Sequence, residues 1–295
     1  MIITPFIFTL IAAGLTRVFA LNHFSGITVS NGVGGSSTYT CRTQAQWNEL
    51  AYVVKKSGFK SLRIIGFDCD ALNRASTAAA HAGLTILAGI YIPGSVHAHM
   101  TTTDNDLRAF RDAYHRFGPG RFVGLTIGNE VIDLPVAIAS EVHRAKALLV
   151  SMGVYTPVAT AHSWVQYSNN PILCRGDFVA ANAHAFYDGH VTAQNAGNFV
   201  EQTVIPALKL ACPGKKITIT ESGWPSRGPA DGSGSASTSA EKAALINLNC
   251  ASKNDPHVAV YAFEYDDQMW KDKENERSFG IFGKFSLGND VLAVC

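Results

Sequence analysis

Two glutamates stand where two apolar stretches of the sequence end. Glu130 follows residues 122–129 in the string Thr-Ile-Gly-Asn-Glu-Val, and Glu221 follows residues 216–220 in the string Ile-Thr-Glu-Ser-Gly-Trp-Pro. A single glutamate at a strand end is more often solvated or ion-paired than catalytic. Two of them at the same end of parallel strands would face one mouth and favour chemistry there.

Two carboxyls suit the cleavage of a glycosidic bond. One stays protonated and donates to the leaving oxygen, while the other stays ionised and attacks the anomeric carbon. Their repulsion keeps the pKa of the acid raised until the nucleophile carries the sugar, and the acid then becomes the base for water or a second sugar. This mechanism retains the anomeric configuration and requires the carboxyls to lie about 5–5.5 Å apart.

Eight β-branched stretches alternate with helical patterns and must position these carboxyls. We predict strands at residues 26–30, 61–66, 85–92, 122–130, 154–161, 178–186, 216–221 and 258–264. We predict helices at residues 44–56, 72–82, 104–117, 136–152, 198–211 and 239–251, with a short helix within 163–173. The pattern predicts an α/β fold, a single-domain (β/α)8 TIM barrel. A doubly wound open sheet is the alternative, although no dinucleotide-type glycine fingerprint follows the first strand.

Strand alternation predicts which side chains face the barrel interior. If Glu130 points inward, Gly124, Thr126 and Gly128 do too, and Ile127 faces the helices. By the same reasoning, Ile217 and Ile219 should point inward with Glu221. Asn129 would point away from the mouth, so we predict a bulge that brings it to the site.

The first twenty residues form a separate segment. Residues 2–15 are almost continuously apolar, and Val18-Phe19-Ala20 resembles a small-residue cleavage site. This indicates a signal peptide over residues 1–20, followed by a catalytic domain over residues 21–295. The apolar run is short for a bilayer span, so we expect no stable membrane span.

Cysteine content and net charge limit the cellular compartments and the classes of partner that we expect for this chain. The chain has six cysteines without a CxxC pair, which favours disulfides over structural zinc but leaves the pairing open. The formal net charge is +1, without a long basic or acidic run, so nothing indicates nucleic acid as a partner. We expect a secreted or cell-wall protein, a monomer without a cofactor.

The two glutamate strings resemble those of glycoside hydrolase family 17, the β-1,3-glucanases and glucanosyltransferases. The resemblance extends from about Gly26 to Phe282 and is closest to the fungal cell-wall branch; its most specific string is Thr-Glu-Ser-Gly-Trp-Pro-Ser at 220–226. It implies a (β/α)8 fold, retention, no metal, Glu130 as acid/base and Glu221 as nucleophile. It also implies that Asn129 hydrogen-bonds the 2-hydroxyl of the sugar at the cleavage point.

The resemblance carries over to four further positions. Tyr187 matches a tyrosine that orients the nucleophile by a hydrogen bond, with a core tyrosine as the alternative. The family places an acidic residue and a lysine after strand eight, and Asp267 with Lys271 is the best match. The spacing is one residue longer than in plant members, and Glu264 competes for the acidic position.

Aromatic residues follow several predicted strands, where sugar-binding platforms belong. They are Tyr91, Trp164, Trp224, Tyr265 and Trp270. Each could instead be a core residue, but together they favour a polysaccharide groove over a closed pocket. His97 and His99 could share a face, yet no carboxylate or cysteine cluster accompanies them, so we expect no metal site.

These observations predict an enzyme acting on β-1,3-glucan oligosaccharides or polysaccharide, either an endo-β-1,3-glucanase or a β-1,3-glucanosyltransferase. The outcome depends on whether water or a sugar reaches the glycosyl-enzyme first. A retaining β-1,4-glycanase of the same barrel type is one alternative. A catalytically inactive cell-wall glucan-binding protein is another, against which the presence of both glutamates argues.

Overall fold

The chain folds as a closed barrel of eight parallel strands. The computed structural model describes residues 21–295, so the predicted signal peptide lies outside the described residues. The strands follow one another around the barrel in chain order: β1 (Gly26–Val29), β2 (Ser61–Ile64), β3 (Thr85–Ile90), β4 (Phe122–Asn129), β5 (Val158–Ser163), β6 (Val179–Asn182), β7 (Ile217–Ser222) and β8 (Val258–Ala262). Because β1 pairs with β8, the sheet closes, which confirms the TIM barrel and excludes the open sheet.

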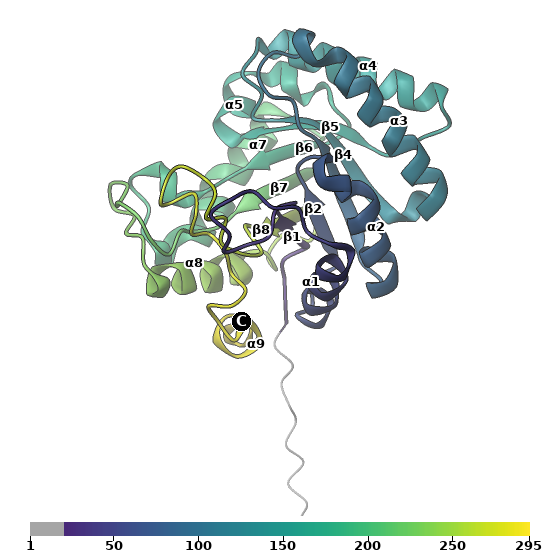
Figure 1. Cartoon of the computed structure of the whole chain (residues 1–295). Helices are drawn as coiled ribbons and strands as arrows, with labels where there is room; N and C mark the ends of the chain where they lie inside the picture. The colour runs from purple at the N-terminus through teal and green to yellow at the C-terminus, as the bar shows by residue number, and fades with distance from the viewer. Residues whose placement is uncertain (1–20) are drawn as a thin grey trace, which may run out of the picture.

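Helices surround the barrel and bury the outer faces of the strands (Figure 1). They are α1 (Gln44–Lys56), α2 (Ala71–Ala82), α3 (Met100–Phe117), α4 (Pro135–Ser151), α5 (Trp164–Asn169), α6 (Ala196–Phe199), α7 (Ile205–Ala211), α8 (Thr238–Ala251) and α9 (Leu287–Asp290). The helix predicted over 198–211 is interrupted by a π-helical turn, Val200–Val204. Pro206 follows that turn and has no N–H to donate to the carbonyl four residues earlier.

Strands five and six differ from their predicted bounds. β5 begins at Val158, just after Pro157, which has no backbone N–H for the ladder. β6 ends at Asn182, because Ala185–Asp188 forms a 3-10 turn. His184 and Tyr187 therefore lie on a loop above the strand.

The strand-four prediction is confirmed where it matters for the site. The buried side chains form two clusters: an inner core inside the ring of strands and an outer core shared by the strands and the helices. A Cβ on Gly124 would meet Leu87 and Phe178 of the inner core, whereas Ile127 packs in the outer core. The pairing of β4 with β5 shifts register between Thr126 and Asn129, as the predicted bulge requires. Gly128 has φ +79°, and a Cβ there would come within 2.2 Å of the Val131 side chain.

The inward direction predicted for Ile217 and Ile219 is wrong. Both side chains belong to the outer core, while the Thr220 hydroxyl bonds Asn182 inside the barrel. β7 shifts register against both of its neighbours near its carboxyl end. Such irregularities break the two-residue alternation, so Glu221 reaches the mouth although Ile219 faces the helices.

Three disulfides and a long final segment complete the fold. The pairs are Cys41–Cys69, Cys174–Cys212 and Cys250–Cys295. After β8 the chain continues beside β1, where Tyr265 N–H donates to the Thr28 carbonyl, and it later returns so that Ile281 N–H donates to the Glu264 carbonyl. This segment brings residues 264–282 beside the carboxyl ends of the strands.

Candidate active site

Glu130 and Glu221 line one cavity at the carboxyl end of the barrel. Its volume is about 380 Å³, and Trp164, His184 and Phe263 are among the other lining residues. The two glutamates come from the ends of β4 and β7, which lie three strands apart around the barrel. The barrel thus joins two carboxyls that are separated by ninety-one positions in the chain (Glu130 to Glu221).

Glu221 is a buried carboxyl held by two donors. Arg63 of β2 places Nη1 2.6 Å from Oε1, and His184 places Nε2 3.2 Å from Oε2. Burial opposes ionisation, but the charge of Arg63 and the hydrogen bond from His184 outweigh it and lower the pKa of Glu221 to about 2. Glu221 is therefore an ionised carboxylate across the neutral pH range.

Glu130 lies in a different environment, exposed at the mouth of the cavity. Among residues 21–295, its one side-chain hydrogen-bond partner is the amide of Asn182, whose Nδ2 donates to Oε1 at 3.0 Å. Loss of hydration and then the negative charge of Glu221 raise its pKa, although Asn182 acts in the opposite direction. Its backbone is left-handed, with φ +51°, so the extended conformation of β4 ends at the preceding residue, Asn129.

Hydrogen bonds connect the two carboxyls through Asn129 and Asn182. Asn129 Oδ1 accepts from Arg63 Nη2 at 2.8 Å and from Asn182 Nδ2 at 3.4 Å. Thr220 donates to Asn182 Oδ1 at 2.7 Å and so orients that amide toward Glu130. The predicted bulge therefore does bring Asn129 between the two glutamates.

Sequence reasoning missed Arg63, Asn182 and His184. One signal was available: Arg63 lies inside an apolar strand, and a buried arginine requires a buried partner. Asn182 and His184 were included in the predicted sixth strand, 178–186, and their polar side chains were not considered as site residues there.

Lys271 pairs with Glu264 and not with Asp267. Lys271 Nζ lies 2.9 Å from Glu264 Oε1. Asp267 instead accepts from Lys284 at 2.8 Å and from Arg227 at 3.1 Å, away from both glutamates. Of the two candidates for the acidic position, the structure thus places Glu264 beside the lysine, and burial raises its pKa to about 7.

The Tyr187 hydroxyl hydrogen-bonds Glu276 and not Glu221, contrary to the prediction. His184, three residues earlier, makes the contact with Glu221 instead. The 3-10 turn after β6 points the two rings in different directions, and this could not be read from spacing alone. Tyr187 still lines the cavity that contains Glu130 and Glu221.

The predicted aromatic platforms divide into two groups. Trp164 lines the first cavity, and Tyr91 and Trp270 line a second cavity of about 480 Å³ that also contains Asn129, Glu264 and Lys271. Trp224 is fully buried and donates to the Ser235 carbonyl, so it cannot be a platform. Tyr265 stacks on Phe282 and lines neither cavity, because the final segment packs its ring against the outer core.

Within residues 21–295, no three histidine, cysteine, aspartate or glutamate side chains gather as metal ligands. His99 Nδ1 lies 3.0 Å from the Ser95 carbonyl, in a short 3-10 turn before α3.

Comparison with known proteins decides the family. Residues 26–283 match the BtgE/BtgC glycoside hydrolase domain. The chain belongs to this family. Among relatives of this glycoside hydrolase, the cell surface mannoprotein MP65 of Candida albicans is 31% identical over 243 residues, which cover 78% of this chain and 59% of MP65. The probable family 17 glucosidase SCW10 of Saccharomyces cerevisiae is 29% identical over 242 residues, 79% of this chain and 58% of that protein.

Solved structures agree with the family 17 resemblance. A glycoside hydrolase family 17 β-1,3-glucanosyltransferase from Rhizomucor miehei matches with a TM-score of 0.72 and 25% identity, over 89% of this chain and 94% of that one. An active-site mutant of a β-1,3-glucanosyltransferase from the same organism, in complex with laminaritriose, shares the fold at 23% identity. Its TM-score is 0.74, and the match covers 92% of this chain and 99% of that one.

The comparisons and the disulfides also bear on location. This glycoside hydrolase spans about three fifths of the length of MP65 and SCW10. All six cysteines are paired, which indicates an oxidising, extracellular environment. Among residues 21–295, none of the helices has both the length and the hydrophobicity of a bilayer span.

Proposed function

We propose that this glycoside hydrolase acts on β-1,3-glucan with retention of configuration, with Glu221 as nucleophile and Glu130 as acid/base. One observation carries the proposal: two carboxyls line one cavity with opposite pKa shifts. Double displacement requires one ionised carboxyl and one that can donate a proton, and a lowered pKa at Glu221 with a raised pKa at Glu130 suits these two roles.

In the first step, Glu130 donates its proton to the glycosidic oxygen while a Glu221 oxygen attacks the anomeric carbon. The bond to the leaving sugar breaks, and an ester bond to Glu221 forms. Glu221 then carries no charge, so one cause of the raised pKa of Glu130 disappears and Glu130 keeps its ionised form. In the second step, Glu130 takes a proton from water or a sugar hydroxyl, which attacks the anomeric carbon and frees Glu221.

Arg63, His184 and Asn129 act as positioning groups in this proposal. Arg63 and His184 hold one oxygen each of the Glu221 carboxylate, which fixes its plane before the attack. Asn129 is linked to Glu221 through Arg63 and to Glu130 through Asn182, and in this position it can hydrogen-bond the sugar 2-hydroxyl in the transition state.

The two cavities accommodate the two sides of the cleaved bond. They share Phe263 as a lining residue; the cavity with Trp164 contains both Glu130 and Glu221, and the other contains Asn129, which Arg63 links to Glu221. Since the acid must reach the leaving oxygen, the Trp164 cavity is the side of the leaving sugar and of the acceptor. The Tyr91–Trp270 cavity is then the side of the sugar chain that stays on Glu221.

Products formed from a laminari-oligosaccharide series test the proposal. We expect β-anomers as the first products, seen by NMR before mutarotation, and products longer than the substrate, seen by mass spectrometry, if a sugar is the acceptor. The Glu221→Gln protein is the control for contaminating activity. First products of α configuration, or turnover of β-1,4-glucan or mannan instead of laminari-oligosaccharides, would refute the proposal.

A further inference from the structure

We propose that Tyr39, Asp68 and Trp270 form a sugar-binding subsite in the second cavity, called here the Tyr39 subsite, and that the Cys41–Cys69 disulfide fixes its geometry. The proposal rests on the proposed function, because its ligand is a glucosyl residue of the bound β-1,3-glucan. Three loops build the subsite: residues 30–43 after β1, residues 65–70 after β2 and the final segment after β8.

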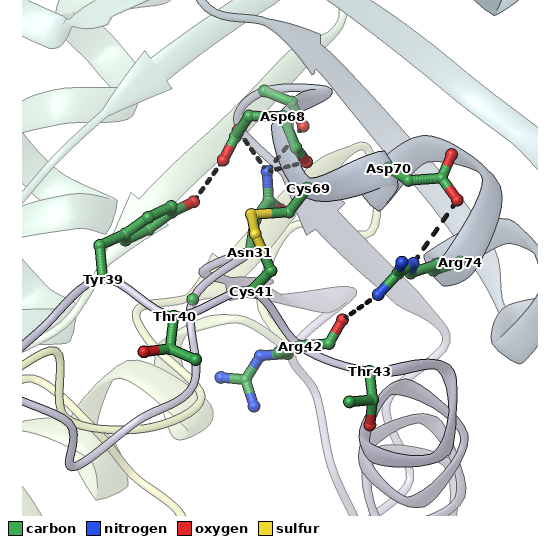
Figure 2. Close-up of a disulfide and its surroundings, with 12 residues drawn as sticks. Asn31, Tyr39, Thr40, Cys41, Arg42, Thr43, Asp68, Cys69, Asp70 and Arg74 are labelled. Atoms are coloured by element: carbon green, nitrogen blue, oxygen red, sulfur yellow. Dashed lines mark hydrogen bonds and ion pairs between the residues drawn. A yellow bond between two sulfur atoms is a disulfide. The ribbon is translucent and has the colours of Figure 1, made fainter.

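Asp68 is the polar centre of the Tyr39 subsite. The Tyr39 hydroxyl donates to Asp68 Oδ2, and Asn31 Nδ2 donates to Oδ1 at 2.7 Å (Figure 2). Asp68 is exposed, so its carboxylate keeps acceptor capacity for the hydroxyl groups of a ligand. A carboxylate oriented by two donors at the edge of an aromatic wall suits a neutral sugar.

The aromatic wall is open to the cavity although its side chains are large and apolar. Tyr39 is 39% exposed, Trp270 is 36% exposed, and Tyr91 is 54% exposed. Tyr39 and Trp270 meet edge to face, with ring centroids 4.9 Å apart, an arrangement that leaves a ring face uncovered. The indole N–H of Trp270 donates to Gln268 at 2.9 Å, which orients the indole ring. Exposed aromatic faces that gather on one cavity mark a binding surface.

The disulfide ties two of the three loops together beside these groups. Cys41 follows Tyr39 by two residues, and Cys69 is the residue after Asp68 (Figure 2). Arg42 anchors the same loop to the final segment through Asp266, at 2.6 Å. The positions of Tyr39, Asp68 and Trp270 are therefore set before a ligand arrives, which lowers the entropic cost of binding.

Backbone strain at the disulfide supports a functional role. Cys69 and Asp70 have φ of +59° and +55°, and within residues 21–295 the one other non-glycine residue with positive φ is Glu130. Left-handed residues other than glycine are unfavourable and concentrate at active sites and ligand clamps. The turn Asp68–Asp70 thus shares left-handed backbone at non-glycine residues with Glu130, the proposed acid/base.

Substitution of Tyr39 and Asp68 tests the subsite. We expect Tyr39→Ala to raise KM for the longer laminari-oligosaccharides roughly tenfold, with kcat unchanged, because an aromatic contact with the sugar is lost. Tyr39→Phe and Asp68→Asn should raise KM roughly threefold, the size of one hydrogen bond. Short substrates that do not reach the subsite should show no change. Tyr52→Ala, an exposed tyrosine on α1, is the matched control.

The Cys41→Ser/Cys69→Ser double variant tests the role of the disulfide. We expect its KM to rise with substrate length as in Tyr39→Ala, while kcat on the shortest substrate stays the same. Wild-type protein that turns over laminari-oligosaccharides while Tyr39→Ala and Asp68→Asn have unchanged KM at every length would overturn the subsite alone. Wild-type protein without turnover at any length would overturn the proposed function itself.

Discussion

The ends of β4 and β7 carry the same functional group in opposite electrostatic environments. At β7, Glu221 is buried between Arg63 and His184, and its pKa is lowered. At β4, Glu130 is exposed beside an uncharged amide, and its pKa is raised. The difference shows that burial alone does not decide the protonation of a carboxyl, because the more buried of the two is the one that stays ionised. The cationic neighbour decides it.

Among the changes that test this difference between Glu130 and Glu221, removal of either carboxyl should have the largest effect on kcat. Glu221→Gln should lower kcat by about 10⁴-fold or more, because the covalent route is lost. Glu130→Gln should lower it by about 10²–10⁴-fold, the usual contribution of general acid–base catalysis.

Azide rescue identifies which carboxyl has which role. With an aryl β-laminarioside as substrate, Glu221→Ala plus azide should give the α-glycosyl azide, because azide attacks from the vacated face. Glu130→Ala plus azide should give the β-glycosyl azide, because azide attacks the glycosyl-enzyme. NMR of the products tests this, and the reverse outcome would exchange the two roles.

Loss of Arg63, the β2 cation that pairs with Glu221, should make Glu221 resemble Glu130. Arg63→Met leaves a buried carboxyl without its main counter-charge, so we expect the pKa of Glu221 to rise and kcat to fall by about 10²–10³-fold. Because the nucleophile must be ionised, the acid limb of the kcat/KM pH profile should move toward neutral pH. Arg108→Met, on the exposed face of α3, is the control and should match wild type. An unmoved acid limb would contradict the dominance of Arg63.

Loss of the Asn182 amide, which β6 places beside Glu130, should have a smaller effect and act on the opposite limb of the pH profile. Asn182→Ala removes a hydrogen bond to ionised Glu130, so the pKa of Glu130 should rise further and kcat should fall about tenfold. The basic limb of the kcat/KM profile should then move to higher pH. Thr220→Val keeps the amide but removes the hydroxyl that orients it, and should shift the same limb less. A shift to lower pH would contradict the contact with Glu130.

Tyr187→Phe is expected to have the smallest effect. Its hydroxyl bonds Glu276, so kcat should stay within about threefold of wild type, the size of one exposed hydrogen bond. His184→Phe removes a donor to Glu221 and should lower kcat about tenfold. Steady-state rates on one laminari-oligosaccharide compare the two. A larger loss for Tyr187→Phe would restore the tyrosine as the partner of the nucleophile.

Local pattern was sufficient where a feature depends on neighbours in the chain. The number and alternation of the elements predicted the closed barrel, and α1 was predicted at its observed bounds, where Thr43 caps the first turn. The strings around Glu130 and Glu221 placed both carboxyls at strand ends, and strand alternation, which would turn Asn129 away from the mouth, led to the predicted bulge. These features follow from hydrophobic periodicity, capping and turn chemistry, which act over a few residues.

Packing decided the positions that local pattern left open. Trp224 and Trp270 each follow a strand. Trp224 is buried against Phe186, whereas Trp270 is partly exposed and lines a cavity. The disulfide pairs join cysteines 28 to 45 residues apart, which no spacing rule selects.

The sequence by itself determined the fold class, the two glutamates and the strand ends that carry them, because these features depend on hydrophobic periodicity and on short motifs. Tertiary structure alone decided the partners of the glutamates. Arg63 comes from β2, whereas Asn182 and His184 come from the end of β6 and the loop after it, and strand register and loop turns bring them to Glu221 and Glu130. The pKa of a carboxyl depends on charges a few ångströms away in space, and distance along the chain does not determine that separation.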